Sequence, residues 1–147
     1  MSDVARSREQ RKADTLARLA APVLDAWVAT DGPYLVPLTL AWFEERLIAA
    51  TDGASPTAKS LISTGRARIG IGPTRDVIMI DAVLERRLPV GEAHEVGEAY
   101  AAQNDWDPRT AGPDYVFLVL RPTRIQAWRE ANEIPGRTLM RDSTWLP

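Results

Sequence analysis

The chain has 147 residues and a mass of 16.2 kDa, enough for one domain whose core folds without disulfides or a metal. Its 18 Lys and Arg residues against 20 Asp and Glu give a net charge of −2, which argues against nucleic-acid binding. With no Cys and a single His, the sequence excludes a disulfide scaffold, a thiolate nucleophile and histidine-rich metal centres. We expect one domain over residues 1–147, with no metal site and no catalytic side chain.

The sequence offers no membrane segment. No run approaches the roughly 18 apolar residues that span a bilayer. The most apolar N-terminal stretch, residues 16–30, is interrupted by Arg18, Pro22 and Asp25, so it lacks the unbroken apolar core of a signal peptide. We therefore expect a soluble, cytoplasmic protein with neither a membrane nor a nucleic acid as a partner.

The first expected element is an N-terminal helix within residues 1–21. Residues 4–21 are good helix formers, and Pro22 ends the run. Leu16, Leu19 and Ala20 fall on one apolar stripe. The basic residues lie off this stripe, on a face that we expect to be solvated: Arg6, Arg8, Arg11 and Lys12.

Short runs rich in β-branched and aromatic residues follow, separated by turn signals. They predict strands at residues 23–30, 34–42, 46–51, 66–72 and 77–88. Helices are expected at residues 56–64 and 91–104, and a loop at 105–113. Residues 115–120 and 124–128 then form a strand pair, or one strand kinked at Pro122. The C-terminal segment, residues 130–147, has no strong period.

Many strands with short links and few helices predict a mainly antiparallel sheet. About six strands at this spacing close into a small barrel or a sandwich.

The sequence GASPTAKS, residues 53–60, is the best local motif. It differs from the phosphate-loop pattern GxxxxGK[ST], because Ala58 stands at the second glycine and Pro56 removes one amide donor. A nucleoside triphosphatase is therefore not predicted.

The start of the expected helix still favours an anion. Ser55 is a good N-cap, and Lys59 and Ser60 follow within about a turn. Unpaired amides, the positive helix end and an ammonium group would converge there on a phosphate. The alternative is that Ser55 and Pro56 only cap a connecting helix and that Lys59 is solvated.

Two further features have modest weight. Gly70 and Gly72 leave one face of their strand without side chains, which indicates either a close approach by a ring or backbone or a bend of the barrel. His94 and Glu98 share a helix face, and we expect both to face solvent. The five Trp residues are expected mainly in the core or at an interface.

In their order and spacing these segments resemble the flavin-binding split-barrel superfamily typified by pyridoxamine phosphate oxidases. The resemblance covers about residues 16–146, nearly the whole chain. The segments that carry it are VPLTLAW (36–42), RLIAAT (46–51), SPTAKSL (55–61), ARIGIG (67–72), GPTRDVIMIDAVLE (72–85), PTRIQAW (122–128) and GRTLMRDSTWL (136–146).

The resemblance implies a six-stranded antiparallel split β-barrel with flanking helices, in a homodimer. FMN, or a deazaflavin coenzyme of the F420 type, would lie in the groove between the two barrels. Lys59 and Ser60 would contact the cofactor phosphate, with Thr51 and Ser55 nearby. The residues that would flank the ring are Pro37, Leu38 and Thr39.

The sequence departs from its relatives at two places. Many of them carry an arginine shortly before the loop lysine, where this chain has Thr57 and Ala58. Pyridoxamine phosphate oxidases have a C-terminal Arg/His cluster, whereas this chain has Arg137 and Arg141 without a histidine, so vitamin oxidation is not expected.

The resemblance implies an oxidoreductase that reduces or oxidises a small organic substrate. Two alternatives stay open, namely a non-catalytic flavin or tetrapyrrole carrier and a barrel that serves as an interaction module without a cofactor. The loop lysine favours the enzyme and the carrier over the third reading.

Overall fold

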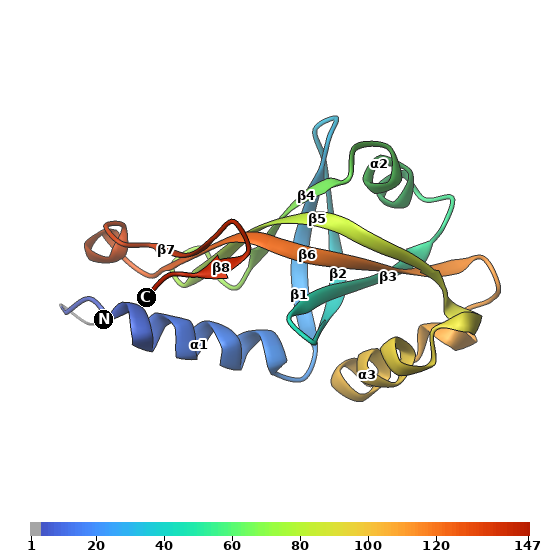
Figure 1. The fold of residues 1–147 in the computed structure, drawn as a ribbon, viewed down its shortest axis with the longest axis horizontal. Helices are drawn as coiled ribbons and strands as arrows, with labels where there is room; N and C mark the ends of the chain where they lie inside the picture. Colours follow the sequence, from blue (N-terminus) through green and yellow to red (C-terminus); the bar gives the residue numbers. More distant parts are fainter. Residues whose placement is uncertain (1–3) are drawn as a thin grey trace.

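The computed structural model describes residues 4–147, so residues 1–3 of the expected N-terminal helix lie outside the described part (Figure 1). In chain order the elements are α1 (Arg8–Ala20), β1 (Leu24–Thr30), β2 (Tyr34–Phe43), β3 (Arg46–Asp52), α2 (Pro56–Thr64), β4 (Arg66–Ile71), β5 (Val77–Pro89), η1 (Val90–Glu92), α3 (His94–Asn104), η2 (Pro108–Thr110), β6 (Tyr115–Trp128), η3 (Ala131–Glu133), β7 (Thr138–Arg141) and β8 (Thr144–Trp145). The five strands expected before residue 90 are confirmed to within one residue at each end.

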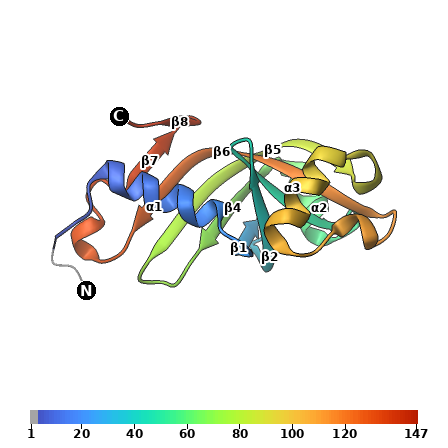
Figure 2. The same cartoon turned by 90° about the horizontal axis from the view of Figure 1, so that it is seen from below.

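The strands form an antiparallel barrel. They follow the order β3-β2-β1-β4-β5-β6-β7-β8, and an additional pairing of β3 with β6 closes β1 to β6 into a ring. The expected six-stranded antiparallel barrel is confirmed, with β7 and β8 added at the edge of β6. Figures 1 and 2 show α1 and α3 along one side of the barrel and α2 on the other.

Strand β6 is a single element rather than a pair. Its first half pairs with β3 as far as Leu120, and its second half pairs with β7 from Ile125 onward. Pro122 lies between the two stretches, opposite a register shift at Ala82 of β5. The proline lacks a backbone N–H, and its position at the change of partners keeps that loss from interrupting either ladder.

The C-terminal segment is more ordered than its sequence pattern indicates. Leu139 and Met140 of β7 are buried, and Leu146 donates a backbone hydrogen bond to Leu139 (2.8 Å). Two buried positions and a two-residue β8 are too few to produce a readable period.

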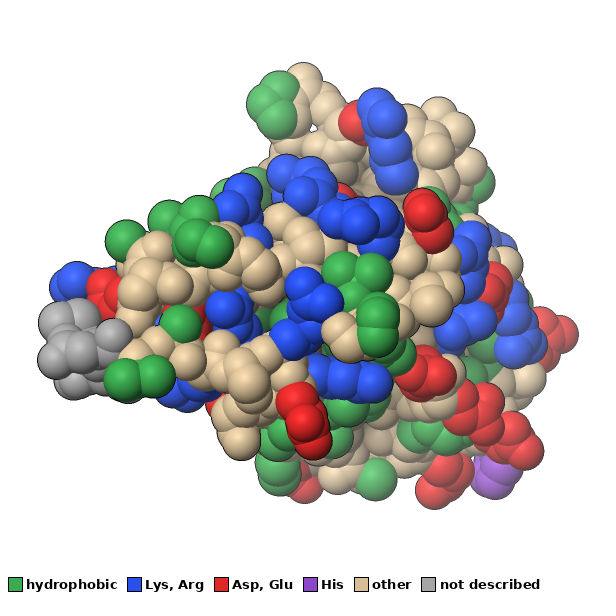
Figure 3. Space-filling view, turned by 60° about the vertical axis from the view of Figure 1, so that its left-hand side comes forward, with side chains coloured by type: hydrophobic (Ala, Val, Ile, Leu, Met, Phe, Trp, Pro, Cys, Tyr) green, Lys and Arg blue, Asp and Glu red, His purple; other side chains and the backbone are tan. Residues whose placement is uncertain are grey.

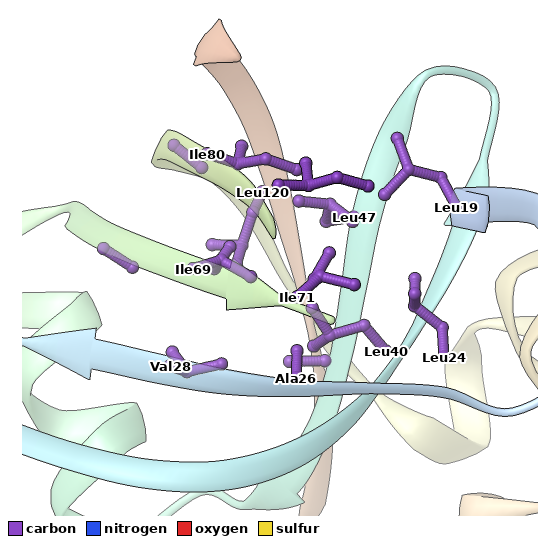
Figure 4. Packing of buried hydrophobic residues seen from close by; sticks show 14 of the residues in the cluster. Leu19, Leu24, Ala26, Val28, Leu40, Leu47, Ile69, Ile71, Ile80 and Leu120 are labelled. Atoms are coloured by element: carbon purple, nitrogen blue, oxygen red, sulfur yellow. The ribbon is translucent and has the colours of Figure 1, made fainter. Parts of the chain in front are cut away.

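The main core fills the inside of the barrel (Figure 4). Leu19 of α1 and Leu61 of α2 are both fully buried in this cluster, although they come from opposite ends of the barrel. The two helices therefore seal the barrel. Alternation along β1, with Val28 buried and Trp27 exposed, follows the two-residue period of a strand with one face inside.

Helix α3 covers part of the outer barrel surface with a second apolar cluster. Tyr100 and Val96 pack there against Phe117 of β6 and its neighbours on β2 and β3. At the end of α3 the Asn104 side chain accepts from the Leu24 amide (3.1 Å) and donates to the Leu40 carbonyl (2.9 Å). This buried amide fixes α3 to both strands of the first hairpin.

Helix α1 departs from the expected pattern. Leu19 is buried as expected, but Ala20 is exposed and Arg11 is only 5% exposed. The Arg11 guanidinium donates to four backbone carbonyls: that of Arg6 (3.3 Å) and, far along the chain, those of Ala127 (3.2 Å), Glu133 (2.8 Å) and Pro135 (3.3 Å). The expectation that Arg11 is solvated was wrong, because three of these carbonyls belong to the end of β6 and the segment after it, 116 or more positions away.

Among residues 4–147, every helix is too short or too polar to cross a lipid bilayer.

The N-terminal segment is joined to the loop before β7 by one buried ion pair. Arg6 and Glu133, whose side chains are 11% and 3% exposed, meet at 2.7 Å. The hydrogen bond from Arg6 lowers the pKa of Glu133 to about 2 from an ordinary 4.5. This stabilisation is fully present above about pH 4.5 and is lost as the pH falls toward 2.

We expect Glu133→Gln to lower the free energy of unfolding by about 3 kcal/mol at pH 7 and by much less near pH 2.5. Urea unfolding of both proteins at the two pH values measures the difference. Glu130→Gln is the control, because its partner Arg75 is largely exposed and exposed pairs contribute about 0–1 kcal/mol. An equal loss at both pH values would contradict the assignment.

Candidate functional site

The expected phosphate site lies where β3 passes into α2. Ser55 is the N-cap: its hydroxyl accepts from the Ala58 amide (3.1 Å) and from the Thr51 hydroxyl (3.2 Å). Pro56 occupies the first turn of α2, as its fixed φ allows. Lys59 is exposed and Ser60 is partly exposed. The structure thus brings Thr51 and Ser55 into contact and supports α2 on them.

The backbone amides at this turn are mostly used within the protein. Gly53 donates to the Asp114 carbonyl (2.9 Å), Ser55 to the Asp52 carbonyl (3.0 Å) and Ala54 to the Asp52 carboxylate (2.8 Å). Ala58 and Lys59 donate to Ser55. Within residues 53–59 this leaves the Thr57 amide alone for an anion. The expected convergence of several free amides was therefore wrong, and the positive charge here comes from side chains and the helix end.

An arginine absent from the sequence motif lies beside this turn. A Cβ on Gly53 would stand 3.2 Å from Nη2 of Arg87 on β5 and 3.3 Å from the Asp114 carbonyl oxygen. Gly53 therefore lets the Arg87 guanidinium approach the loop. Within residues 4–147, no ion pair involves Lys59 or Arg87. Arg87 comes from a strand more than 20 residues further along, so no local pattern in the sequence signals it.

Of the residues expected to flank a ring, Pro37 and Thr39 lie on the outer face of β2, whereas the Leu38 side chain packs against the core. Pro37, Leu38 and Thr39 line a cavity of about 500 Å³ together with residues of β1 and β4. Trp27 pairs with Pro37 on one side and with Gly70 on the other. Trp27 is 55% exposed, and its two neighbours carry little or no side chain above the sheet. The result is a flat apolar shelf.

Two polar contacts hold β2 beside this cavity. The Thr39 hydroxyl donates to the Asp25 carboxylate (2.8 Å), and the Tyr100 hydroxyl donates to the Thr39 carbonyl (2.8 Å). Burial raises the pKa of Tyr100 to about 12. Tyr100 therefore stays a protonated donor at neutral pH.

Gly70 of β4 and Gly72 of the following turn are glycines for different structural reasons. A Cβ on Gly70 would stand at an ordinary contact distance from the Met79 sulfur (3.5 Å), so space does not require glycine here, and the missing side chain keeps the shelf flat. Gly72 has φ +89°, and a Cβ there would clash with the Arg18 guanidinium and the Asp76 carbonyl. The sequence left a close approach and a bend of the barrel as interpretations of these glycines. The close approach applies at Gly72, where the Arg18 side chain and the Asp76 backbone lie next to the glycine.

The expected site residues fall into two groups. Thr51, Ser55, Lys59 and Ser60 belong to the β3–α2 turn, whereas the lining of the shelf cavity contains no residue of α2. The pairing of β2 with β3 stops at Leu40, so the first half of β2 diverges from the strand that leads to α2. His94 is exposed at the start of α3, as expected, and belongs to neither group.

Comparison with known proteins relates this geometry to a known fold. No family model and no curated protein matches the sequence. Three similar solved structures are an F420 reductase (18% identity, TM-score 0.61, 74% of this chain and 94% of the other), a putative pyridoxamine 5′-phosphate oxidase from Listeria innocua (14%, 0.57, 85% and 98%) and a heme binding protein from Mycobacterium smegmatis (21%, 0.59, 92% and 58%).

The chain has the split-barrel fold. The resemblance to the flavin-binding split-barrel superfamily is confirmed at the level of the fold.

The N-cap of α2 gives a stability prediction. Ser55→Ala removes the acceptor of the Ala58 amide and should cost about 1 kcal/mol of unfolding free energy. Ser55→Asp keeps an acceptor at the helix start and should stay within about 0.5 kcal/mol of the wild type. Urea titrations followed by circular dichroism measure both. A Ser55→Ala protein as stable as the wild type would show that the cap does not hold α2.

Proposed function

We propose that the protein binds FMN or a deazaflavin coenzyme and acts as an oxidoreductase on a small organic substrate. The observation that carries this proposal is the pair of cations at the start of α2, Lys59 and Arg87, which have no carboxylate partner within residues 4–147. A phosphate between them would receive charge-assisted hydrogen bonds and the positive end of the helix. Ser60 offers a hydroxyl, while Thr51 and Ser55 hold the turn in place.

The shelf supports the other half of the proposal. A planar ring needs an apolar, nearly flat surface, and the cavity over Trp27, Pro37 and Gly70 has about 500 Å³, within the range of small-molecule sites. Leu38 and Thr39 complete its lining on β2. When bound, a flavin or deazaflavin supplies hydride transfer. The chain's own part is to bind the phosphate, orient the ring and exclude water.

Many relatives carry an arginine in the loop where this chain has Thr57 and Ala58, and the structure shows why an arginine would not fit there. Thr57 and Ala58 are buried against the barrel, so an arginine at either position would have no solvent-facing place. Arg87 reaches the same turn from β5. In this proposal Arg87 therefore supplies the second positive charge that the loop lacks.

A homodimer belongs to the same proposal. Trp27 (55% exposed) and Leu35 (60% exposed) lie on neighbouring strands of an outer face that α3 leaves open, and Leu35 faces the same side as Trp27. A second copy over this face would cover both side chains and close the shelf cavity. Obligate dimers of this kind bury on the order of 2,000 Å² or more.

A non-catalytic flavin or tetrapyrrole carrier is the second candidate. One structure of the same fold is named a heme binding protein, which supports a carrier role for the scaffold. Haem iron takes an axial His, Cys, Met or Tyr ligand. The single His of this chain, His94, is exposed and does not line the shelf cavity, so haem bound there would lack a histidine ligand. The visible spectrum of the purified protein, followed by titration with FMN, deazaflavin and haemin, separates the ligands. Turnover of reduced cofactor then separates enzyme from carrier.

Lys59→Ala tests the phosphate site. Hydrogen bonds to charged groups contribute about 1.5–3 kcal/mol, so the substitution should weaken FMN or deazaflavin binding roughly 10- to 150-fold. The stability of the cofactor-free protein should change by no more than about 0.5 kcal/mol, because Lys59 is exposed. Fluorescence titration measures the affinity.

Riboflavin, which lacks the phosphate, is the matched ligand control. Its affinity should be nearly the same for the wild type and Lys59→Ala. Equal losses for riboflavin and FMN would indicate that Lys59 contacts the ring and not the phosphate. No loss for either ligand would indicate that Lys59 is solvated and contacts neither.

Leu35→Arg tests the dimer. The wild type should have twice the 16.2 kDa chain mass by light scattering at micromolar concentration. Leu35→Arg should shift the population to the monomer, because it introduces a charge into an apolar interface. Ile62→Arg is the control, since Ile62 is 49% exposed on α2. A monomeric wild type would contradict the dimer.

A further inference from the structure

Four arginines surround a second large cavity, away from the shelf. This cavity of about 580 Å³ lies between the start of α1, the second half of β6, β7 and the C-terminal residues. Its arginines are Arg8, Arg124, Arg137 and Arg141, and no Asp or Glu is among its lining residues. We call it the arginine groove. Figure 3 shows Lys and Arg side chains gathered across the middle of the face on the β7 side of the molecule.

The charges of the arginine groove are poorly neutralised by the protein. Arg124 is 4.0 Å from the Asp81 carboxylate, and Asp81 is held more closely by Arg68 (2.6 Å). Arg137 donates to the backbone carbonyl of Ile134 (3.1 Å), which orients its guanidinium without cancelling its charge. Arg8 donates to an oxygen of the last residue, Pro147 (2.8 Å), so it is the least available of the four arginines. Within residues 4–147, no ion pair involves Arg141. In a chain of net charge −2, this gathering of cations is a local exception.

The wall behind the groove is fixed. Buried Arg11 donates to the carbonyls of Glu133 and Pro135, and Glu133 is held by Arg6. On β6, the Gln126 side chain donates to the Thr138 hydroxyl (3.2 Å) beside a register shift between β6 and β7. Such shifts re-aim side chains at the edge of a sheet. The arginines therefore stand on a held frame, which lowers the ordering cost of binding.

The groove also has an apolar part. Ile134 is 43% exposed, and Pro135 and Leu146 line the same cavity. The Arg137 guanidinium lies 5.7 Å from the centre of the Trp128 ring, within the range of a cation–π contact. A bare inorganic ion would leave this apolar surface unused, whereas an organic body could cover it.

We propose that the arginine groove binds a small organic molecule with two anionic groups, phosphate or carboxylate. Guanidinium forks match both groups bidentately, and Arg124, Arg137 and Arg141 together exceed what one anionic group needs. The apolar wall contacts the carbon body that joins the two groups. This inference does not depend on the proposed cofactor, because no residue of the α2 turn or the shelf cavity lines the groove.

The test uses the full chain without cofactor, at low ionic strength. The probe is 4-carboxyphenyl phosphate, with phenyl phosphate and inorganic phosphate as comparisons, titrated by calorimetry and by the shift of the Trp128 indole N–H in NMR spectra. We expect the two-group probe to bind at least 10-fold more tightly than inorganic phosphate, with phenyl phosphate between them, and to shift the Trp128 signal.

Arg137→Gln with Arg141→Gln should weaken the two-group probe at least 10-fold. Arg66→Gln with Arg86→Gln is the control: both arginines are exposed outside the groove, and the loss of charge is equal. It should change the affinity less than threefold. Arg141→Gln alone keeps the test valid if the double variant is unstable, and it should weaken binding at least threefold.

Equal losses in the control and in the groove variant would reduce the effect to general electrostatic attraction and overturn the proposal. Equal affinities for the two-group probe and inorganic phosphate would show that the groove does not recognise an organic ligand with two anionic groups. An unshifted Trp128 signal would show that the probe binds outside the groove. Either result would overturn the proposal. Lack of binding by all three probes would likewise overturn it. FMN affinity is measured separately, with Lys59→Ala. The proposed cofactor site and the proposed groove ligand can therefore be confirmed or contradicted independently of each other.

Discussion

The closure of the barrel by β6 is the constraint on which the other features depend. This strand pairs with β5 along almost its whole length, and it changes its second partner from β3 to β7 near Pro122. The first half completes the ring and the second half carries the C-terminal hairpin. Two of the three candidate binding regions therefore depend on this strand, since the α2 turn follows its partner β3 and the arginine groove lies over β6 and β7.

Closure also determines which surfaces remain open. The inside of the barrel is filled and sealed by Leu19 and Leu61, so it holds no ligand. Helix α3 occupies the outer surface of β2, β3 and β6. The surfaces that remain uncovered are the outer face of β1 and β4, the turn before α2 and the β7 side. Each of these carries a chemically distinct surface: apolar around Trp27, cationic beside Ser55 and strongly cationic around Arg141.

Local patterns were enough to predict most of the fold. Hairpin turns such as Glu44-Glu45, where both residues have positive φ, and the Ser-Pro start of α2 are encoded within a few residues. Contacts between distant segments were not readable. Arg11 looks like a solvated helix residue until its carbonyl partners near Glu133 are known, and Arg87 has no local relation to the loop that it reaches. The same holds for the α2 turn, because the sequence does not show that its amides donate hydrogen bonds to Asp52 and Asp114.

The way α1 is attached has a consequence for the internal dynamics of the molecule. Its buried residues are Arg11, Thr15 and Leu19, so Leu19 is the one large apolar side chain that this helix buries. The remaining attachment is mainly polar, through Arg11 and Arg18 of the helix and Arg6 before it. Hydrogen bonds to carbonyls and ion pairs to carboxylates give less net stabilisation than the packed core inside the barrel. Helix α1 is therefore held to the barrel mainly by polar contacts, and we expect its backbone amides to exchange with solvent in a partial unfolding that leaves the ring of strands intact.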